Sequence, residues 1–162
     1  MSKWAIVLCF VAGAALCWGV YVPTVHRAAT LLSSNLRAFL FVGVAYFLTA
    51  ILVPSIFLFL LRFDPTAKGA PVWAMGPALW GIAAGTAGAL GALCIIFAAN
   101  TAGKGAAIYV APLVFAGAPI VNTFATMAYF DPPRTTPDWR FFLGLVLAAA
   151  GMSMVVLYRP QA

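Results

Sequence analysis

The fold of this chain is decided by the stretch GIAAGTAGALGALCIIFAANTAGKGAAIYVAPLVFAGAPIVNTF, residues 81–124. Two long apolar runs are joined there by a short segment, Asn100 to Lys104, and Lys104 is the one charged residue of the stretch. A helix needs roughly 20 apolar residues to cross a hydrocarbon core of about 30 Å, and in lipid its backbone must satisfy its own hydrogen bonds. The stretch therefore predicts two transmembrane helices with a tight turn between them.

Three similar apolar runs lie outside this stretch. The five predicted spans cover residues 4–22, 38–61, 77–99, 105–129 and 141–158. Apolar residues make up 65% of the chain and charged residues 7%, whereas a soluble domain carries about a quarter charged residues. We therefore predict an all-α integral membrane protein, a single domain over residues 1–162 that forms a bundle of about five transmembrane helices. A signal peptide is the alternative for the first run, but that run continues to Val22.

The charged residues exclude several classes of function. The nine Lys and Arg residues are spread over many short polar segments and form no basic patch, so we expect the lipid bilayer as a partner and no nucleic acid. A single histidine and three aspartates, all outside the apolar runs, offer no catalytic dyad or triad and no set of metal ligands. We expect no enzyme, no catalytic residue, no metal and no cofactor. Proton exchange through a carboxylate inside the membrane is also not expected.

The third apolar run carries a face of small residues. Gly81, Gly85, Gly88 and Ala92 follow one another at helical spacing, and small residues allow the backbones of membrane helices to approach closely. We expect this face to pack against another helix. Ordinary packing within the bundle, a subunit interface and a substrate path all remain open as explanations.

Candidate residues for a substrate path occur in the first apolar run and in the joint after the third. Trp18, Tyr21 and Thr24 follow at steps of three, so a ligand could stack on Trp18; a cluster of aromatic anchors at the membrane interface is the alternative. Asn100 and Lys104 lie in the joint, where a lysine beside the start of a helix could hold an anionic group. A lysine that reaches the lipid headgroups is the alternative there.

The fourth apolar run is the first choice for a helix that lines a path. It contains prolines, which remove backbone hydrogen bonds, and several polar side chains, and its candidate residues are Tyr109, Pro112, Asn122 and Thr126. Hydrogen bonds between neighbouring helices are the alternative explanation of the polar groups.

Several motifs resemble the EamA-type repeat of the drug/metabolite transporter superfamily. They are the WG..VP pattern at Trp18 to Pro23, LRAF at 36–39, ANTAGKGAAIYVAPL at 99–113 and WRFFLGLVLAAAGMSMVV at 139–156. The resemblance implies one five-helix repeat, and two oppositely oriented repeats make a full transporter with substrate bound between them near the midplane. The sequence departs from the family pattern in two places. The family often has a glutamate after the fourth helix of the repeat, and the nearest acidic residue here is Asp131. The glutamate in the first helix of the small multidrug resistance branch is absent.

The resemblance implies a half-size transporter subunit that moves a small metabolite across a bacterial cytoplasmic (inner) membrane. Five spans place the termini on opposite sides, and the Lys and Arg residues divide almost evenly between the sides: Lys3, Arg62, Lys68, Arg134 and Arg140 against Arg27, Arg37, Lys104 and Arg159. Such a small difference specifies orientation weakly. We therefore expect an antiparallel homodimer, with a second five-helix subunit as the alternative partner. A non-transporting scaffold or accessory subunit is the alternative function.

Overall fold

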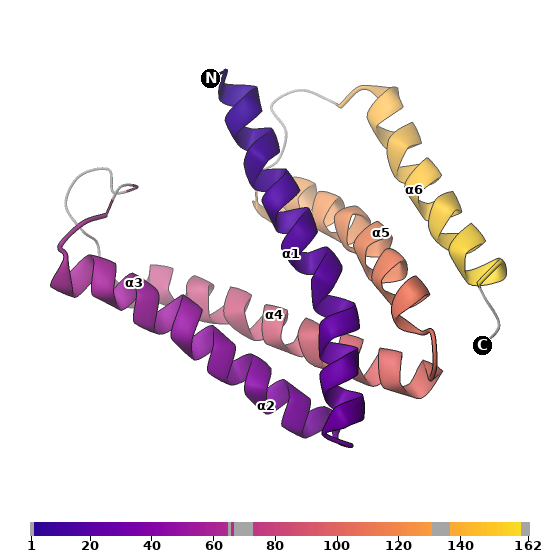
Figure 1. The fold of residues 1–162 in the computed structure, drawn as a ribbon. Coiled ribbons are helices and arrows are strands. Elements are labelled where there is room, and N and C mark those ends of the chain that lie inside the picture. Colours follow the sequence, from indigo (N-terminus) through magenta and orange to yellow (C-terminus); the bar gives the residue numbers. More distant parts are fainter. Residues whose placement is uncertain (1, 65, 67–72, 131–136, 160–162) are drawn as a thin grey trace. The chain divides into compact units, whose positions relative to one another are not determined.

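The computed structural model describes residues 2–64, 66, 73–130 and 137–159, and in these ranges it is built of helices with no strand (Figure 1). Five helices are long and apolar enough to span a membrane, so the predicted all-α architecture of about five such helices is confirmed. They are α1 (Lys3–Leu31), a continuous helix Asn35–Leu60, α4 (Met75–Ala102), α5 with its extension (Ala107–Phe130) and α6 (Trp139–Leu157).

The first helix is longer than predicted, because α1 continues through Pro23 to Leu31 instead of ending near Val22. The hydroxyl of Thr24 donates to the carbonyl oxygen of Val20 at 2.6 Å, within the turn that the proline interrupts. Val22, Val25 and Ala29 are buried and follow at steps of three and four, so one face of the helix continues past the proline. Burial along this face, which the local sequence does not reveal, overrides the usual effect of proline.

The turn after α1 is correspondingly short. Ser33 adopts a left-handed conformation with φ 49°, and the N–H of Ser34 donates to the carbonyl of Ala29 at 3.1 Å, which closes the end of α1. The Ser34 hydroxyl then accepts a hydrogen bond from the N–H of Arg37 at 3.3 Å and caps the next helix. The polar joint predicted over residues 23–37 is therefore reduced to a few residues.

The second span combines α-helical and π-helical turns. It consists of α2 (Asn35–Tyr46), η1 (Phe47–Leu52), α3 (Val53–Ser55) and η2 (Ile56–Leu60). Pro54 lies in α3 and cannot donate to the carbonyl four residues earlier, and wider turns on both sides let the helix continue around it. The hydroxyl of Thr49 donates to the carbonyl of Ala45 at 2.8 Å and so satisfies itself inside the helix.

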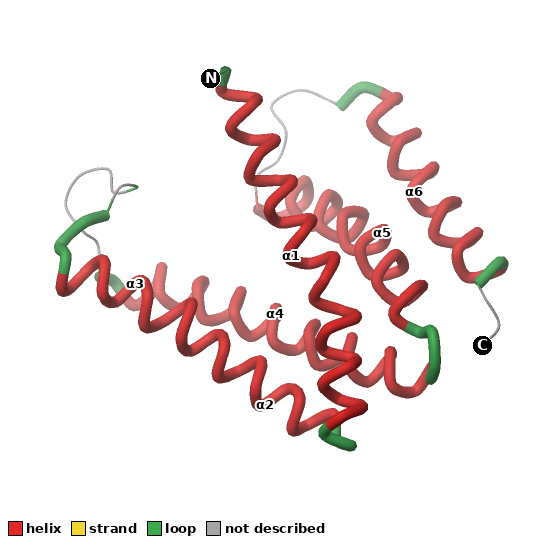
Figure 2. The backbone as a smooth tube through the Cα atoms, viewed as in Figure 1, coloured by secondary structure: helices red, strands yellow, loops and turns green. Residues whose placement is uncertain are grey.

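Helices α4 and α5 are connected by a very short turn that requires glycine (Figure 2). Gly103 and Gly105 have φ angles of 80° and 77°, a region that residues with a Cβ rarely adopt. The N–H of Gly103 donates to the carbonyl of Asn100, and the N–H of Ala106 donates to the carbonyl of Gly103, both at 3.2 Å. The predicted tight turn between the third and fourth spans is thus confirmed.

The chain forms two compact units, Met1–His26 with Ala98–Ala162, and Arg27–Phe97. In the first unit α5 (Ala107–Ala125), its π-helical extension η3 (Thr126–Phe130) and α6 pack together. Tyr109 lies near Arg159 and Gly117 near Met152, so α5 and α6 run antiparallel. A Cβ added to Gly117 would lie 3.6 Å from Met152 Sδ, which places the two helices in close contact at this glycine.

Most apolar side chains of the spans are exposed. Buried residues are concentrated in the second half of α1, at the start of α2, in the second half of α4 and at the start of α5: Val22, Val25, Ala29, Ala38, Ala92, Ile95, Ile96, Ala99, Ala106 and Val110. In the most apolar 18-residue stretch of each span, between 0 and 22% of the stretch is buried by the rest of the chain. Exposed apolar surface of this extent on long helices is suited to lipid, as expected for a multi-pass integral membrane protein.

Candidate functional site

Three aromatic side chains form a cluster between α1 and α5 in the first unit. The ring centroids of Trp18 and Tyr21 are 5.4 Å apart with an interplanar angle of 64°. The centroids of Trp18 and Phe115 are 6.0 Å apart at 67°. Both contacts are edge-to-face, so Trp18 joins the two helices, and it is still 40% exposed. This aromatic cluster therefore has an accessible indole ring on which a ligand could stack.

The aromatic cluster lies deep inside the spans. In α1 the charged residues nearest the two ends are Lys3 and Arg27, whose midpoint is Ala15, and Trp18 is displaced from that midpoint by about 5 Å along the axis. Phe115 lies a similar distance, about 5 Å, from the middle of Ala107–Phe130. Anchoring aromatics belong at the headgroup level, roughly 15 Å from the membrane centre. The extension of α1 thus favours the ligand interpretation of Trp18 over the interfacial one.

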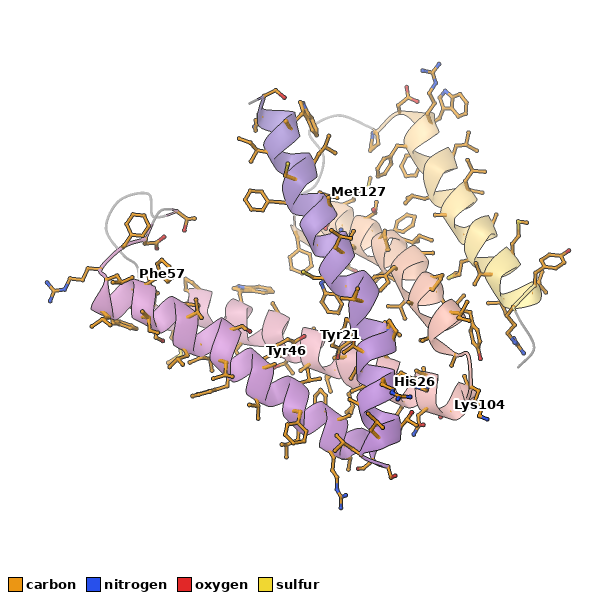
Figure 3. All side chains as sticks on the ribbon, in the orientation of Figure 1. Tyr21, His26, Tyr46, Phe57, Lys104 and Met127 are labelled. Carbon is orange, nitrogen blue, oxygen red and sulfur yellow. The ribbon has the colours of Figure 1, made fainter. Side chains whose placement is uncertain are left out.

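The other two candidates on α1 differ in what they offer a ligand. Tyr21, labelled on α1 in Figure 3, is half-buried and belongs to the aromatic cluster through its edge-to-face contact with Trp18. Thr24 is exposed, but its hydroxyl proton is already donated to the carbonyl of Val20. The Thr24 hydroxyl can therefore only accept a hydrogen bond from a ligand. The spacing in the sequence did not distinguish Thr24 from Trp18 and Tyr21 in this respect.

Phe115 was not among the residues expected from the sequence. A phenylalanine inside an apolar run carries no signal that separates it from residues facing lipid. Its one distinguishing feature is its position at helical spacing between Pro112 and Pro119. Only the placement of α1 beside α5 shows that Phe115 meets Trp18.

The polar residues of α5 continue from the aromatic cluster along the helix. Pro112 and Asn122 are exposed and Thr126 is half-buried, and all three follow Phe115 or precede it at steps of three or four residues. They therefore lie on one face, together with Phe115. All three predicted path residues of the first run and all four of the fourth are thus carried by α1 and by α5 with its extension, which meet at Trp18.

Asn100 lies near the end of α4, and Lys104, labelled in Figure 3, lies in the turn that follows it, so both are away from the middle of the spans. Both side chains are exposed. The N–H groups of Ile108, Tyr109 and Val110 at the start of α5 donate to the carbonyls of Gly105 and Ala106 at 2.9–3.1 Å. Tight turns thus occupy most of the backbone donors that an anion beside Lys104 would need, which was not expected from the sequence.

Tyr109 has a partner that the sequence did not indicate. The guanidinium carbon of Arg159 lies 6.0 Å from the centroid of the Tyr109 ring, a cation–π arrangement at the end of the α5–α6 pair. Arg159 follows the last helix, and the sequence indicated a role for it only in membrane topology. Tyr109 thus contacts a terminal arginine and lies nearer the end of its helix than the aromatic cluster does.

The acidic side chains that the structure describes serve local turns. Asp138 caps α6 by accepting a hydrogen bond from the N–H of Arg140 at 2.8 Å. Asp64 accepts hydrogen bonds from the N–H and hydroxyl of Thr66 at 2.9 and 2.7 Å. Asp131, compared above with a family glutamate, lies outside the described residues, as do Lys68 and Arg134. No group of three metal-binding side chains occurs in the described ranges.

The small-residue face of α4 is covered only in part. Ala92 is 1% exposed, and the same face continues through the buried residues Ile95, Ile96 and Ala99. Toward the other end, a Cβ added at Gly81, Gly85 or Gly88 would meet no heavy atom within 4 Å, as far as the structure describes the chain. The packing role of these three glycines stays a prediction.

No protein-family model matches the chain, and neither a curated protein nor a solved structure matches it.

Proposed function

We propose that the chain is a half-size membrane transporter subunit of the drug/metabolite kind, which moves a small metabolite across the cytoplasmic membrane. The observation that carries this proposal is the aromatic cluster, in which Trp18 meets Phe115 well inside the membrane spans. Carriers built from inverted repeats bind substrate near the bilayer midplane, where helices are interrupted. Both helices that form the cluster continue through their prolines, but Pro23 in α1 and Pro112 and Pro119 in α5 each remove one backbone hydrogen bond, which supports a site of this kind.

The chemistry of the site favours a neutral solute. Aromatic rings supply stacking surface, and the Asn122 amide of α5 and the Thr126 hydroxyl at the start of η3 supply neutral hydrogen-bonding groups. The described aspartates, Asp64 and Asp138, serve turns outside the spans, so they are not counter-ions for a cationic substrate.

A complete carrier needs a second five-helix unit. Two copies of opposite orientation would restore the inverted repeats that the motifs at Trp18 and at 99–113 imply. The nearly even division of Lys and Arg between the two ends permits both orientations. A different five-helix subunit is the alternative partner. A bacterial inner membrane is the location that this proposal implies.

Replacing Trp18 by alanine is expected to lower transport roughly tenfold, because two edge-to-face ring contacts and the stacking surface are removed together. The measurement is uptake of a panel of metabolites into vesicles that contain the purified protein. Trp73→Ala is the matched control, since Trp73 is 73% exposed outside the spans and should leave transport unchanged. Equal transport by the two folded variants would remove the aromatic cluster from the path.

The uncovered glycines of α4 favour a second candidate function, a scaffold or accessory subunit. Gly81, Gly85 and Gly88 offer a smooth surface against which a helix of another protein could pack. A stable complex with another membrane protein, together with no flux of any metabolite in vesicles, would favour the scaffold over the carrier.

A further inference from the structure

One face of α5 carries a polar side chain for which the described part of the chain shows no hydrogen bond. Pro112, Phe115, Pro119 and Asn122 are exposed and follow one another at steps of three and four residues, so they share a face of the helix. The side-chain amide of Asn122 makes no hydrogen bond within the part of the chain that the structure describes. This amide has two donors and one acceptor, and an amide without partners is costly in hydrocarbon.

Three hydroxyl groups in other spans differ from the Asn122 amide. The hydroxyls of Thr49, Thr86 and Ser153 each donate to a carbonyl four residues earlier in the same helix, at 2.8, 2.9 and 3.1 Å. Such bonds allow a hydroxyl to face lipid without a further partner. Asn122 shows no such bond among the described residues, so its amide is available to a polar group of another molecule that packs on this face of α5.

A complementary group lies on the same face of α5. Pro119 has no N–H, so it cannot donate to the carbonyl of Phe115 four residues earlier, and that carbonyl is an acceptor. The spanning helix Ala107–Phe130 has 24 residues, and its middle falls between Ala118 and Pro119. Phe115 and Asn122 are equally distant from this point. A two-fold axis through it, in the plane of the membrane, therefore exchanges the two positions.

We infer that α5 packs against α5 of a second, inverted copy of the chain, with the Asn122 amide of each copy donating to the Phe115 carbonyl of the other. This inference rests on the proposed function, which requires two copies of opposite orientation. A parallel copy would instead bring the two Asn122 side chains together. In the inverted arrangement these two side chains are about 10 Å apart along the helix axis, since seven residues separate positions 115 and 122.

Paired cysteines test the arrangement directly. Cys9, Cys17 and Cys94 are first replaced by alanine, and two differently tagged chains are expressed together, one with Phe115→Cys and the other with Asn122→Cys. Oxidation of the membranes should yield a cross-linked dimer that carries both tags. Asn122→Cys alone should give no dimer, because about 10 Å exceeds the reach of a disulfide.

A second pair avoids both residues of the proposed hydrogen bond. Ala111 and Thr126 are also equally distant from the middle of the helix, so Ala111→Cys in one chain should cross-link to Thr126→Cys in the other. Val146→Cys on α6, which is 63% exposed, is the control and should cross-link with neither member of the pair. A dimer from Asn122→Cys alone would show parallel copies and overturn the inference. No cross-link from either mixed pair would overturn it as well.

Loss of the amide should also weaken the dimer. Replacing Asn122 by leucine removes two symmetric hydrogen bonds and is expected to raise the dissociation constant of the dimer in detergent micelles roughly tenfold. Val121→Ala, at an exposed neighbouring position, should leave the constant unchanged. Transport in vesicles separates the two proposals: flux without the mixed cross-links would overturn the α5 interface and leave the carrier, whereas cross-links without flux would do the reverse.

Discussion

Replacing Ile96 by alanine is expected to lower the free energy of unfolding by about 2 kcal/mol. Ile96 lies in the second half of α4 and has 0% of its surface exposed, and it is one of the two largest side chains that are fully buried. The transfer of the removed methyl groups from lipid to the protein interior contributes little free energy, because an isoleucine exposed to lipid is also surrounded by hydrocarbon. The loss therefore comes mainly from the cavity and from lost contacts between atoms.

The neighbouring residue is the control for this substitution. Phe97 is 45% exposed whereas Ile96 is fully buried, so Phe97→Ala removes much surface that faces lipid and opens less internal space than Ile96→Ala does. Its free energy of unfolding should change by no more than about 0.5 kcal/mol. Both variants are measured by reversible unfolding in mixed micelles with increasing sodium dodecyl sulfate. Equal effects of the two substitutions would mean that the buried face of α4 does not stabilise the protein more than the exposed face does.

The spans could be predicted from the sequence because their signal is long and local. A run of about 20 apolar residues between polar joints has few structural alternatives. The α4–α5 turn was equally predictable, since Gly103 and Gly105 on both sides of a lysine indicate a tight reversal and both have positive φ angles. These features depend on neighbouring residues and on the solvent, and both can be read from the chain.

The end of α1 and the aromatic cluster depend on distant residues. Pro23 is a strong local sign of a helix end, but α1 continues to Leu31 with a buried face through Val25 and Ala29. This difference changes the interpretation of Trp18, because only a longer α1 places the indole well inside the membrane. The contact of Trp18 with Phe115 joins positions almost a hundred residues apart in the sequence, and no local pattern predicts it.

The same limit applies to the glycines, since helical spacing alone does not distinguish a packed glycine from an uncovered one. Gly81, Gly85 and Gly88 were predicted to pack because they form a regular stripe, but a Cβ added at any of them would meet no heavy atom of another element within 4 Å in the described parts of the chain. Gly117 belongs to no such stripe and lies against Met152 of α6. Which glycine is covered depends on the positions of the other helices.

Replacing Gly117 by leucine is therefore expected to destabilise the α5–α6 pair by about 1–3 kcal/mol, as overpacking of a close contact does. Gly117→Ala should be tolerated, because its Cβ would lie at an ordinary contact distance of 3.6 Å from Met152 Sδ. Gly144→Leu on α6, where a Cβ meets no described atom within 4 Å, is the control and should have little effect. Unfolding in mixed micelles measures all three.

A second substitution separates a local clash from a general effect on the helix. Met152 is the side chain that a larger residue at position 117 would meet, so Met152→Ala should restore most of the stability lost in the Gly117→Leu variant. Loss of a glycine in a helix would by contrast act through the backbone, and shortening Met152 could not reverse it. If Met152→Ala only adds its own loss to that of Gly117→Leu, the two helices do not meet at this glycine, and the antiparallel pairing of α5 with α6 would have to be revised.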